Sequence, residues 1–512
     1  MLFTEPTFLF LFLPLLIGLY FLRGSREHAA YGNWLLLVAS VIFYAKGGGA
    51  FTWLMLGSIA FNYWMAISVD RAHGSTLREP QGRPEHGRRA TGSPQAALAA
   101  KRRLAFAITV NLVVLGVFKY ANFFVDNVNA LLQVARVPPI AVPHVLLPIG
   151  ISFFTFHAIS YVIDVSRRDA DAQKSPVHAA LYLLLFPQLI AGPIIRYRDI
   201  ADQLARRVVS MDDFAYGVRR FVIGLAKKVL IANVVAVPAD TIFGMPSAEL
   251  STPHAWLGLV CYTLQIYFDF SGYSDMAIGL GRMFGFRFPE NFRWPYVANS
   301  VTAFWRRWHI SLSTWFRDYL YIPLGGNRVS PVRRYGNLLA VFFLCGLWHG
   351  ASWTFVVWGL WHGSFLVIER IGGGIHNRIR NPQSAIRNDT GPFAWPIWPH
   401  VYTLLVVMIG WVFFRADTLP GAIAFLNALA GLTTATPTPY TVAWYLTPEL
   451  WLAIAAGALG STPWVPALAA RLEGANTWSV PLLNTAALMA LLVLSIMSMA
   501  ARTYNPFIYF RF

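Results

Sequence analysis

The sequence predicts an all-α integral membrane protein, a multi-span bundle of about 10–12 helices with additional re-entrant or interfacial helices. Two observations lead to this fold class. Of the 512 residues, 56% are hydrophobic and only 13% are charged, whereas soluble proteins carry about 25% charged residues. The mean hydropathy of +0.49 is too high for a disordered chain. No polar stretch is long enough for a soluble domain, so we expect one membrane domain over residues 1–512.

Apolar runs follow one another along the chain and approach the length that a membrane span needs. The first, from Thr7 to Leu22, has no basic residue before it and no small-residue cleavage site after it, which favours a retained helix over a signal peptide. The further runs lie near 33–45, 50–69, 104–126, 145–165, 177–195, 221–243, 254–281, 335–347, 351–369, 396–414, 447–470 and 480–499. We expect some of the shorter runs to be re-entrant or interfacial.

The net charge of +17 comes mainly from loops between these runs. The stretch 71–103 holds eight basic and two acidic residues, and 196–228 and 306–334 are also basic. Basic loops remain on the cytoplasmic side of a membrane, so 71–103 is expected to be a cytoplasmic loop and the N-terminus to lie outside. The charge therefore indicates membrane orientation rather than nucleic-acid binding.

Several kinds of catalytic and metal site find no support in the sequence. The two cysteines, Cys261 and Cys345, lie in apolar runs and are expected to be small buried residues. An HExxH motif, a GxSxG motif and a P-loop are all absent. The sequence therefore favours neither a metal site, nor a serine hydrolase, nor a transporter driven by ATP.

The segment 304–326 carries cations among aromatic residues. On one continuous helix, Arg306, His309, Ser313 and Arg317 share a stripe about 80° wide, and the tryptophans face another side. Such a helix lines a cytoplasm-facing cavity for an anionic substrate, or lies at the membrane interface with its arginines near lipid phosphates. Both interpretations remain open on this segment alone.

The segment 345–363 places His349 between residues that leave room for another backbone or a ligand. A neutral imidazole there can accept a proton from a hydroxyl, or it can hydrogen-bond a neighbouring helix. A second Trp-His-Gly follows 13 residues later. On a continuous helix it turns His362 about 220° away from His349, so we expect His362 to be structural.

The segment 265–292 contains two carboxylates within an otherwise apolar helix, where charged groups are unfavourable. Asp269 shares one helical face with Gln265, and Asp275 lies on another. Buried carboxylates in membranes pair with cations or backbone donors. We favour a polar network that packs helices, while a role in orienting a catalytic group is the alternative.

The chain resembles the membrane-bound O-acyltransferase family, in particular its bacterial branch that acetylates alginate. The resemblance covers most of the chain. It is carried by FYAKG (43–47), FNYWMAISVD (61–70), FKYANFFVDNVN (118–129), LPIGISFFTFHAISYVIDVSRR (147–168), FPQLIAGPIIRYRDI (186–200), IYFDFSGYSDMAIGLGRMFGF (266–286), ENFRWPY (290–296), FWRRWHISLSTWFRDYLYIPLGGNR (304–328), GLWHGASWTFVVWG (346–359) and YNPFIYFRF (504–512).

The resemblance implies that an acyl group passes from a cytoplasmic donor, acetyl-CoA in this branch, through a funnel in the helix bundle. His349 matches the family's catalytic histidine and His309 its second functional histidine. Arg306 and Arg317, with Ser313 beside them, are then candidates for holding the coenzyme A phosphates. The resemblance further implies a bacterial inner membrane, a periplasmic SGNH-hydrolase-like acetyltransferase partner and a secreted polysaccharide acceptor. Direct transfer is expected, because no acyl-enzyme nucleophile stands out.

Other functions fit the same observations less well. Peptidoglycan O-acetylation, or D-alanyl transfer to teichoic acid, keeps the fold and both histidines and changes the acceptor. A transporter also carries charges within the membrane, but the paired broken helices typical of transporters are not seen. A scaffold for a secretion complex requires neither histidine.

Overall fold

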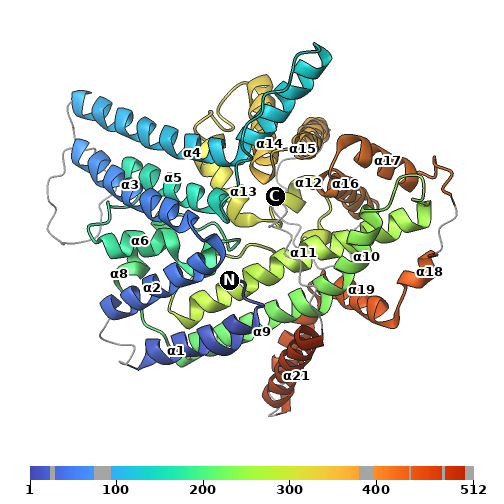
Figure 1. Ribbon diagram of the computed structural model, residues 1–512. Helices are drawn as coiled ribbons and strands as arrows, with labels where there is room; N and C mark the ends of the chain where they lie inside the picture. Colours follow the sequence, from blue (N-terminus) through green and yellow to red (C-terminus); the bar gives the residue numbers. More distant parts are fainter. Residues whose placement is uncertain (23–28, 74–93, 380–396, 437–439, 475–478, 502–512) are drawn as a thin grey trace. The chain divides into compact units, whose positions relative to one another are not determined.

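The computed structural model describes residues 1–22, 29–73, 94–379, 397–436, 440–474 and 479–501. Helices are the only regular secondary structure in these ranges, so the predicted all-α class is confirmed (Figure 1). Parts of the stretches 71–103, 371–395 and 433–447, and the tail 504–512, lie outside the described residues. The chain divides into two compact units, which are described separately below.

Unit 1 comprises Met1–Val218 and Ala277–Pro289. Its helices are the π-helical turn η1 (Phe8–Phe12), α1 (Leu13–Phe21), α2 (Ala29–Gly48), α3 (Phe51–Ala72), α4 (Pro94–Val134), α5 (Ile151–Arg167), α6 (Pro176–Leu184), α7 (Phe186–Leu189), α8 (Tyr197–Ala205) and the first part of α9 (Met211–Ala226). The apolar runs predicted near 33–45, 50–69, 104–126 and 145–165 are therefore helices.

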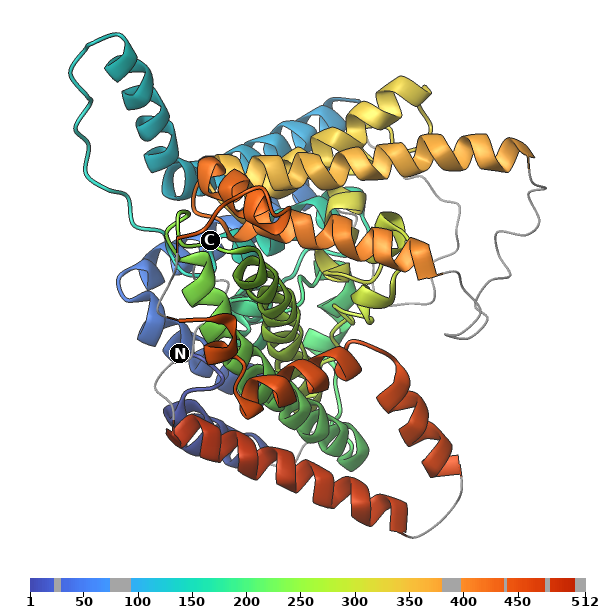
Figure 2. The same ribbon diagram turned by 90° about the vertical axis from the view of Figure 1, so that its right-hand side faces the viewer.

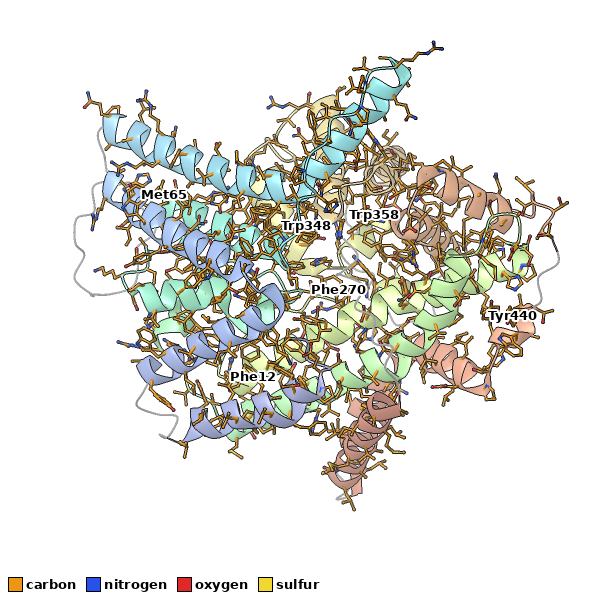
Figure 3. The ribbon with its side chains drawn as sticks, in the orientation of Figure 1. Phe12, Met65, Phe270, Trp348, Trp358 and Tyr440 are labelled. Atoms are coloured by element: carbon orange, nitrogen blue, oxygen red, sulfur yellow. The ribbon has the colours of Figure 1, made fainter. Side chains whose placement is uncertain are left out.

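Helices α3, α4 and α5 pack together in unit 1. Met65 and Val69 of α3 meet Ala107 of α4 and Val162 of α5 in one buried cluster (Met65 is labelled in Figure 3). Beside it, the buried side chains of Asn62 and Asn111 each donate a hydrogen bond to the other, at 3.1 and 2.8 Å. Helices in an apolar medium can be joined by such side-chain hydrogen bonds, because no water competes for them.

Unit 2 comprises Arg219–Met276 and Glu290–Phe512. Its elements are the rest of α9, the π-helical turn η2 (Lys227–Ala232), α10 (Asn233–Phe243), most of α11 (Thr252–Met283), η3 (Pro295–Val297), α12 (Val301–Trp305), α13 (Ile310–Phe316), the π-helical turn η4 (Arg317–Tyr321), α14 (Pro331–His349), α15 (Trp353–Ile379), α16 (Ile397–Arg415), α17 (Leu419–Leu429), α18 (Val442–Tyr445), α19 (Pro448–Gly460), α20 (Trp464–Gly474) and α21 (Ser479–Ala501).

Ion pairs join the carboxylates of α11 to the α9–η2 segment. The buried pair Asp269 and Lys228 is separated by 2.6 Å. Asp275 pairs with Arg220 and Lys227, each at 2.7 Å. These pairs confirm the packing-network interpretation of the 265–292 segment, because each carboxylate is neutralised by a cation from a neighbouring helix.

Among the residues that the structure describes, five helical stretches are long and apolar enough to cross a membrane. They are Phe51–Ala72, Pro94–Val134, Met211–Phe243, Ile397–Arg415 and Val480–Ala501, and a sixth results if Pro448–Gly460 and Trp464–Arg471 form one span bent by 69°. This number is smaller than the count expected from apolar runs. One reason is that α5 has only 17 residues. Another is that α11 carries two carboxylates within its apolar sequence.

Candidate active site

Helices α14 and α15 of unit 2 pack side by side as a hairpin, drawn between yellow and orange in Figure 2. This hairpin carries the candidate site. Helix α14 ends at His349 because Gly350 is fully extended, with φ −164° and ψ 150°. Helix α15 then begins at Trp353. The two helices approach closely where Gly346 meets Gly359, and a methyl group on either glycine would overlap a backbone carbonyl of the facing helix. Glycine is therefore needed at both positions.

The hairpin corrects our expectation for His362. We predicted that His349 and His362 face different sides, which holds only if the helix is continuous. The break at Gly350 folds the second helix back, and the rings of both histidines contact Trp358, with ring centroids 4.9 and 5.4 Å away. The prediction is therefore wrong in its assumption of one continuous helix across Gly350.

Aromatic rings enclose His349, which is only 5% exposed. Its imidazole contacts Trp348, Trp358 and Phe414, with centroid distances of 4.8, 4.9 and 5.2 Å, and all three contacts are edge-to-face. Trp348 and Trp358 are labelled in Figure 3. Rings around an imidazole limit the access of water, which would otherwise compete with an acceptor hydroxyl for an acyl group.

His309 occupies a constrained position just before α13. Its φ of 44° and ψ of 54° are left-handed, an uncommon conformation for a residue with a side chain. The segment around Asn291 holds this conformation, because the Ile310 amide donates a hydrogen bond to the Asn291 carbonyl at 2.9 Å. The His309 ring is fully buried against Phe270, at a centroid distance of 4.6 Å.

The side chain of Asn291 determines which nitrogen of His309 carries the proton. Asn291 Oδ1 accepts from Ser311 N and Ser311 Oγ, and it lies 3.2 Å from His309 Nδ1. The Ser311 backbone N–H can only donate, which identifies Oδ1 as the amide oxygen, and Asn291 Nδ2 then donates to Ser274 Oγ at 3.0 Å. An oxygen that only accepts requires a proton on Nδ1. The lone pair of neutral His309 is therefore on Nε2, which is buried and has no hydrogen-bond partner among the described residues.

Trp348 links the two predicted catalytic histidines. Its ring centroid lies 4.8 Å from that of His349 and 6.2 Å from that of His309. The structure thus brings together residues that are 40 positions apart in the sequence. His309 comes from the loop before α13 and His349 from the end of α14.

The prediction of one continuous helix over 304–326 is wrong. The segment consists of α12, the left-handed residue His309, α13 and η4, so the expected stripe of Arg306, His309, Ser313 and Arg317 does not form. The Gly325–Gly326 pair follows the end of η4 with positive φ, as expected for residues beyond a helix end.

The three predicted donor-site residues differ from His309 in their exposure and in their hydrogen-bond partners. Arg306 caps the end of α12 and is exposed. The side chain of Arg317 is 59% exposed and pairs with Asp318 at 2.7 Å. The hydroxyl of Ser313 donates to the Trp305 carbonyl at 3.4 Å. The two arginines are thus accessible to an anion in solvent, whereas His309 is not.

Sequence reasoning missed Asn291 and the two tryptophans Trp348 and Trp358. Asn291 lies in the ENFRWPY segment, and a polar amide between two apolar runs was the signal for a partner. Both tryptophans precede or flank the histidine motifs, but a single sequence does not distinguish a tryptophan that encloses a site from one that fills a core.

The described part of the chain contains no group of three or more His, Cys, Asp or Glu side chains that could hold a metal ion. Cys261 and Cys345 are both buried and unbridged, as predicted.

The profile of the membrane-bound O-acyltransferase family matches residues 107–411, which include His309, Asn291, His349 and His362. The chain belongs to this family. It is therefore an O-acyltransferase embedded in a membrane, and the resemblance drawn from the sequence motifs is confirmed.

Individual relatives of this O-acyltransferase are similar over much or all of their length. The probable alginate O-acetylase AlgI of Azotobacter vinelandii is 42% identical, with all of both chains covered. The peptidoglycan O-acetyltransferase of Helicobacter pylori is 35% identical over 84% of this chain and 80% of its own. The teichoic acid D-alanyltransferase of Bacillus subtilis is 33% identical over 42% of this chain and 57% of its own.

Proposed function

We propose that this O-acyltransferase takes the acetyl group of cytoplasmic acetyl-CoA and passes it across the inner membrane for O-acetylation of an alginate-like exported polysaccharide. The observation that carries the proposal is the likeness to probable alginate O-acetylases, 42% identical over the whole of both chains. The enclosed His349 at the end of α14 supports it, since a buried imidazole protected from water suits acyl transfer to a hydroxyl.

His349 acts in this proposal as the general base. Its neutral imidazole accepts the proton of the incoming hydroxyl while the hydroxyl oxygen attacks the thioester carbon. The hydroxyl belongs to the polysaccharide itself or to a serine of a periplasmic SGNH-hydrolase-like partner. The proton then passes to the departing thiolate, so the imidazole returns to its starting form.

His309 acts on the donor side. Its Nδ1 is held by Asn291, so the lone pair on Nε2 is aimed by the protein rather than by solvent. A lone pair held in this way accepts a hydrogen bond from an amide N–H of the pantetheine arm or from the coenzyme thiol. The rings of His309 and His349 both contact Trp348, so the proposed donor-side histidine and the proposed base lie next to the same indole.

Arg306 and Arg317 remain our proposal for the phosphate-holding residues, with Ser313 as a neighbouring hydroxyl. Exposed guanidinium groups make charge-assisted hydrogen bonds to phosphate oxygens. The affinity for acetyl-CoA is measured in detergent. Arg306→Ala and Arg317→Ala are each expected to weaken it about tenfold or more, which corresponds to the loss of a charged hydrogen bond. Binding that is unchanged in both variants would remove the arginines from this role.

The placement in the membrane is also proposed. The basic stretch 71–103 is assigned to the cytoplasm and the N-terminus to the periplasm, because basic loops are retained inside. Cysteine accessibility to a membrane-impermeant reagent tests both assignments. We expect a cysteine introduced at Ser75 to be protected in intact cells and one at Leu2 to react, and the reverse pattern would overturn the orientation.

The function itself is tested by replacing His349 in cells that export the polymer. His349→Ala and His349→Gln are expected to lower polymer acetylation at least about a hundredfold, the usual contribution of a general base. The matched control is His254→Gln, which removes another buried histidine whose ring nitrogens bind Ser251 and the Tyr440 carbonyl. Normal acetylation in the His349 variants, with normal amounts of membrane protein, would refute the mechanism.

Peptidoglycan O-acetylation is the second candidate, supported by the relative from Helicobacter pylori. Mass spectrometry of the polymer and of the wall from the same cells separates the two acceptors. Loss of acetyl groups from exported polysaccharide in His349→Ala supports our proposal, and loss confined to muropeptides favours the second candidate. Loss of D-alanine from teichoic acid would instead indicate the activity of the partially covered Bacillus subtilis relative.

A further inference from the structure

One pentapeptide occurs twice in the α14–α15 hairpin. Gly-Leu-Trp-His-Gly spans residues 346–350 and again 359–363. The first glycines of the two copies face each other, since a Cβ on Gly359 would lie 3.2 Å from Gly346 Cα. His349 and His362 each lie three residues beyond these glycines, on helices that run in opposite directions, and are therefore about 9 Å apart along the hairpin. The ring of Trp358 lies between them and contacts both.

His362 belongs to a triangle of three nitrogen-bearing rings, which we call the indole–imidazole triangle and which consists of Trp305, Trp358 and His362. The centroids of Trp305 and Trp358 lie 5.2 and 5.4 Å from that of His362 and 5.8 Å from each other. All three contacts are edge-to-face, and all three side chains are buried.

The nitrogens of this triangle lack hydrogen bonds within the protein. Trp305 Nε1, Trp358 Nε1 and both ring nitrogens of His362 are buried with no partner among the described residues. A buried polar group without a hydrogen bond is unfavourable, because it has given up its hydrogen bonds to water. Phenylalanine at any of these positions would avoid that cost, so such a group calls for a specific explanation.

The balance of donors and acceptors indicates the kind of group that the triangle can bind. Two indole N–H groups and the one N–H of a neutral imidazole give three donors, against a single acceptor nitrogen. A group that only accepts, such as a carbonyl oxygen or an oxyanion, complements this set best. The ring of Trp358 contacts that of His349, so the indole that carries one of these donors lies next to the proposed base.

We propose that the indole–imidazole triangle stabilises the oxyanion of the acyl-transfer reaction, with Trp358 and His362 as its principal donors. This inference rests on the proposed function of His349. Donors that are held in a dry site and aimed at a developing charge are among the largest contributions to acyl transfer, because they need no reorganisation during the reaction.

The acceptor oxygen forms a bond to the thioester carbon, and its proton moves to His349. The π electrons of the carbonyl pass to its oxygen, whose negative charge the N–H groups of Trp358 and His362 stabilise. Collapse of this tetrahedral intermediate re-forms the carbonyl and breaks the carbon–sulfur bond, and the departing thiolate takes the proton from His349.

The test is a set of single-ring substitutions in the purified full-length chain, assayed with acetyl-CoA and an oligosaccharide acceptor. Trp358→Phe and His362→Phe each keep a ring and remove its donor, and we expect each to lower kcat about a hundredfold to a thousandfold with little change in KM. His362→Gln restores an N–H donor and is expected to recover much of the lost rate. A structural role would not show this rescue by glutamine.

Trp361→Phe is the matched control. This tryptophan adjoins His362 on α15, but its indole N–H donates to the Val406 carbonyl at 2.9 Å, outside the triangle. We expect its kcat to stay near the wild-type value. Rates of Trp358→Phe and His362→Phe equal to that of Trp361→Phe would overturn the oxyanion assignment. Activity that persists in His349→Ala would instead refute the proposed function.

Discussion

Replacing Asn291 tests whether His309 is held in one tautomer by the protein. The Asn291 side chain is fully buried and makes four hydrogen bonds. Three of them reach Oδ1, from His309 and from two atoms of Ser311, and the fourth runs from Nδ2 to Ser274. Asn291→Ala removes all four and leaves the Nδ1 proton of His309 without its acceptor.

The size of the effect follows from this count. Each hydrogen bond contributes about 1 kcal/mol net, so Asn291→Ala is expected to lower the free energy of unfolding by about 4 kcal/mol. The control is Asn337→Ala on α14, whose mostly buried amide makes one hydrogen bond, to the Leu324 carbonyl at 3.0 Å. Its expected loss is about 1 kcal/mol. The difference between the variants, about 3 kcal/mol, is the quantity to measure.

Chemical denaturation in detergent, followed by tryptophan fluorescence, gives both free energies. Acetyl transfer by the folded Asn291→Ala protein should also fall about tenfold or more, because the imidazole loses its fixed orientation. A loss of stability equal to that of Asn337→Ala, together with wild-type activity, would refute the assignment of Asn291 as the residue that positions His309.

Three further predictions concern the helix packing that supports the site and unit 1. Lys228→Met alone should destabilise the protein by about 3–5 kcal/mol by leaving Asp269 buried without its cation, whereas the double change with Asp269→Leu should restore near wild-type stability in the same denaturation assay. Asn111→Leu should cost up to about 2 kcal/mol by breaking its reciprocal hydrogen bonds with Asn62, and a variant as stable as wild type would show that the pair contributes nothing. Gly359→Ala should cost about 1–3 kcal/mol because its methyl group meets the backbone of α14, which a lower midpoint of thermal unfolding would report and an unchanged midpoint would contradict.

The sequence was sufficient for the fold class because hydropathy is a local property. The apolar runs near 33–45, 50–69 and 104–126 each became a helix, with ends shifted by several residues. The pairing of Asp269 and Asp275 with cations was also predictable in kind, since a carboxylate in an apolar helix needs a neutralising partner. Its partners were not predictable, because they come from a different helix.

The geometry of the site depends on backbone conformations at His309 and Gly350 that cannot be predicted from the helical periodicity of the sequence. The stripe of Arg306 and Arg317 assumed a continuous helix, but the contacts of Asn291 hold His309 in a left-handed conformation that interrupts it. The separation of His349 and His362 assumed the same continuity across Gly350. Glycine is compatible with a helix and with an extended turn, so only tertiary packing decides between them.

We propose His349 as the base for acyl transfer from acetyl-CoA to a hydroxyl. The most direct measurement is the release of coenzyme A thiol from acetyl-CoA by the purified full-length chain, with and without an oligosaccharide acceptor, in the wild type and in His349→Ala. We expect thiol release that depends on the acceptor in the wild type and falls at least about a hundredfold in His349→Ala. Release by His349→Ala at the wild-type rate would contradict the mechanism.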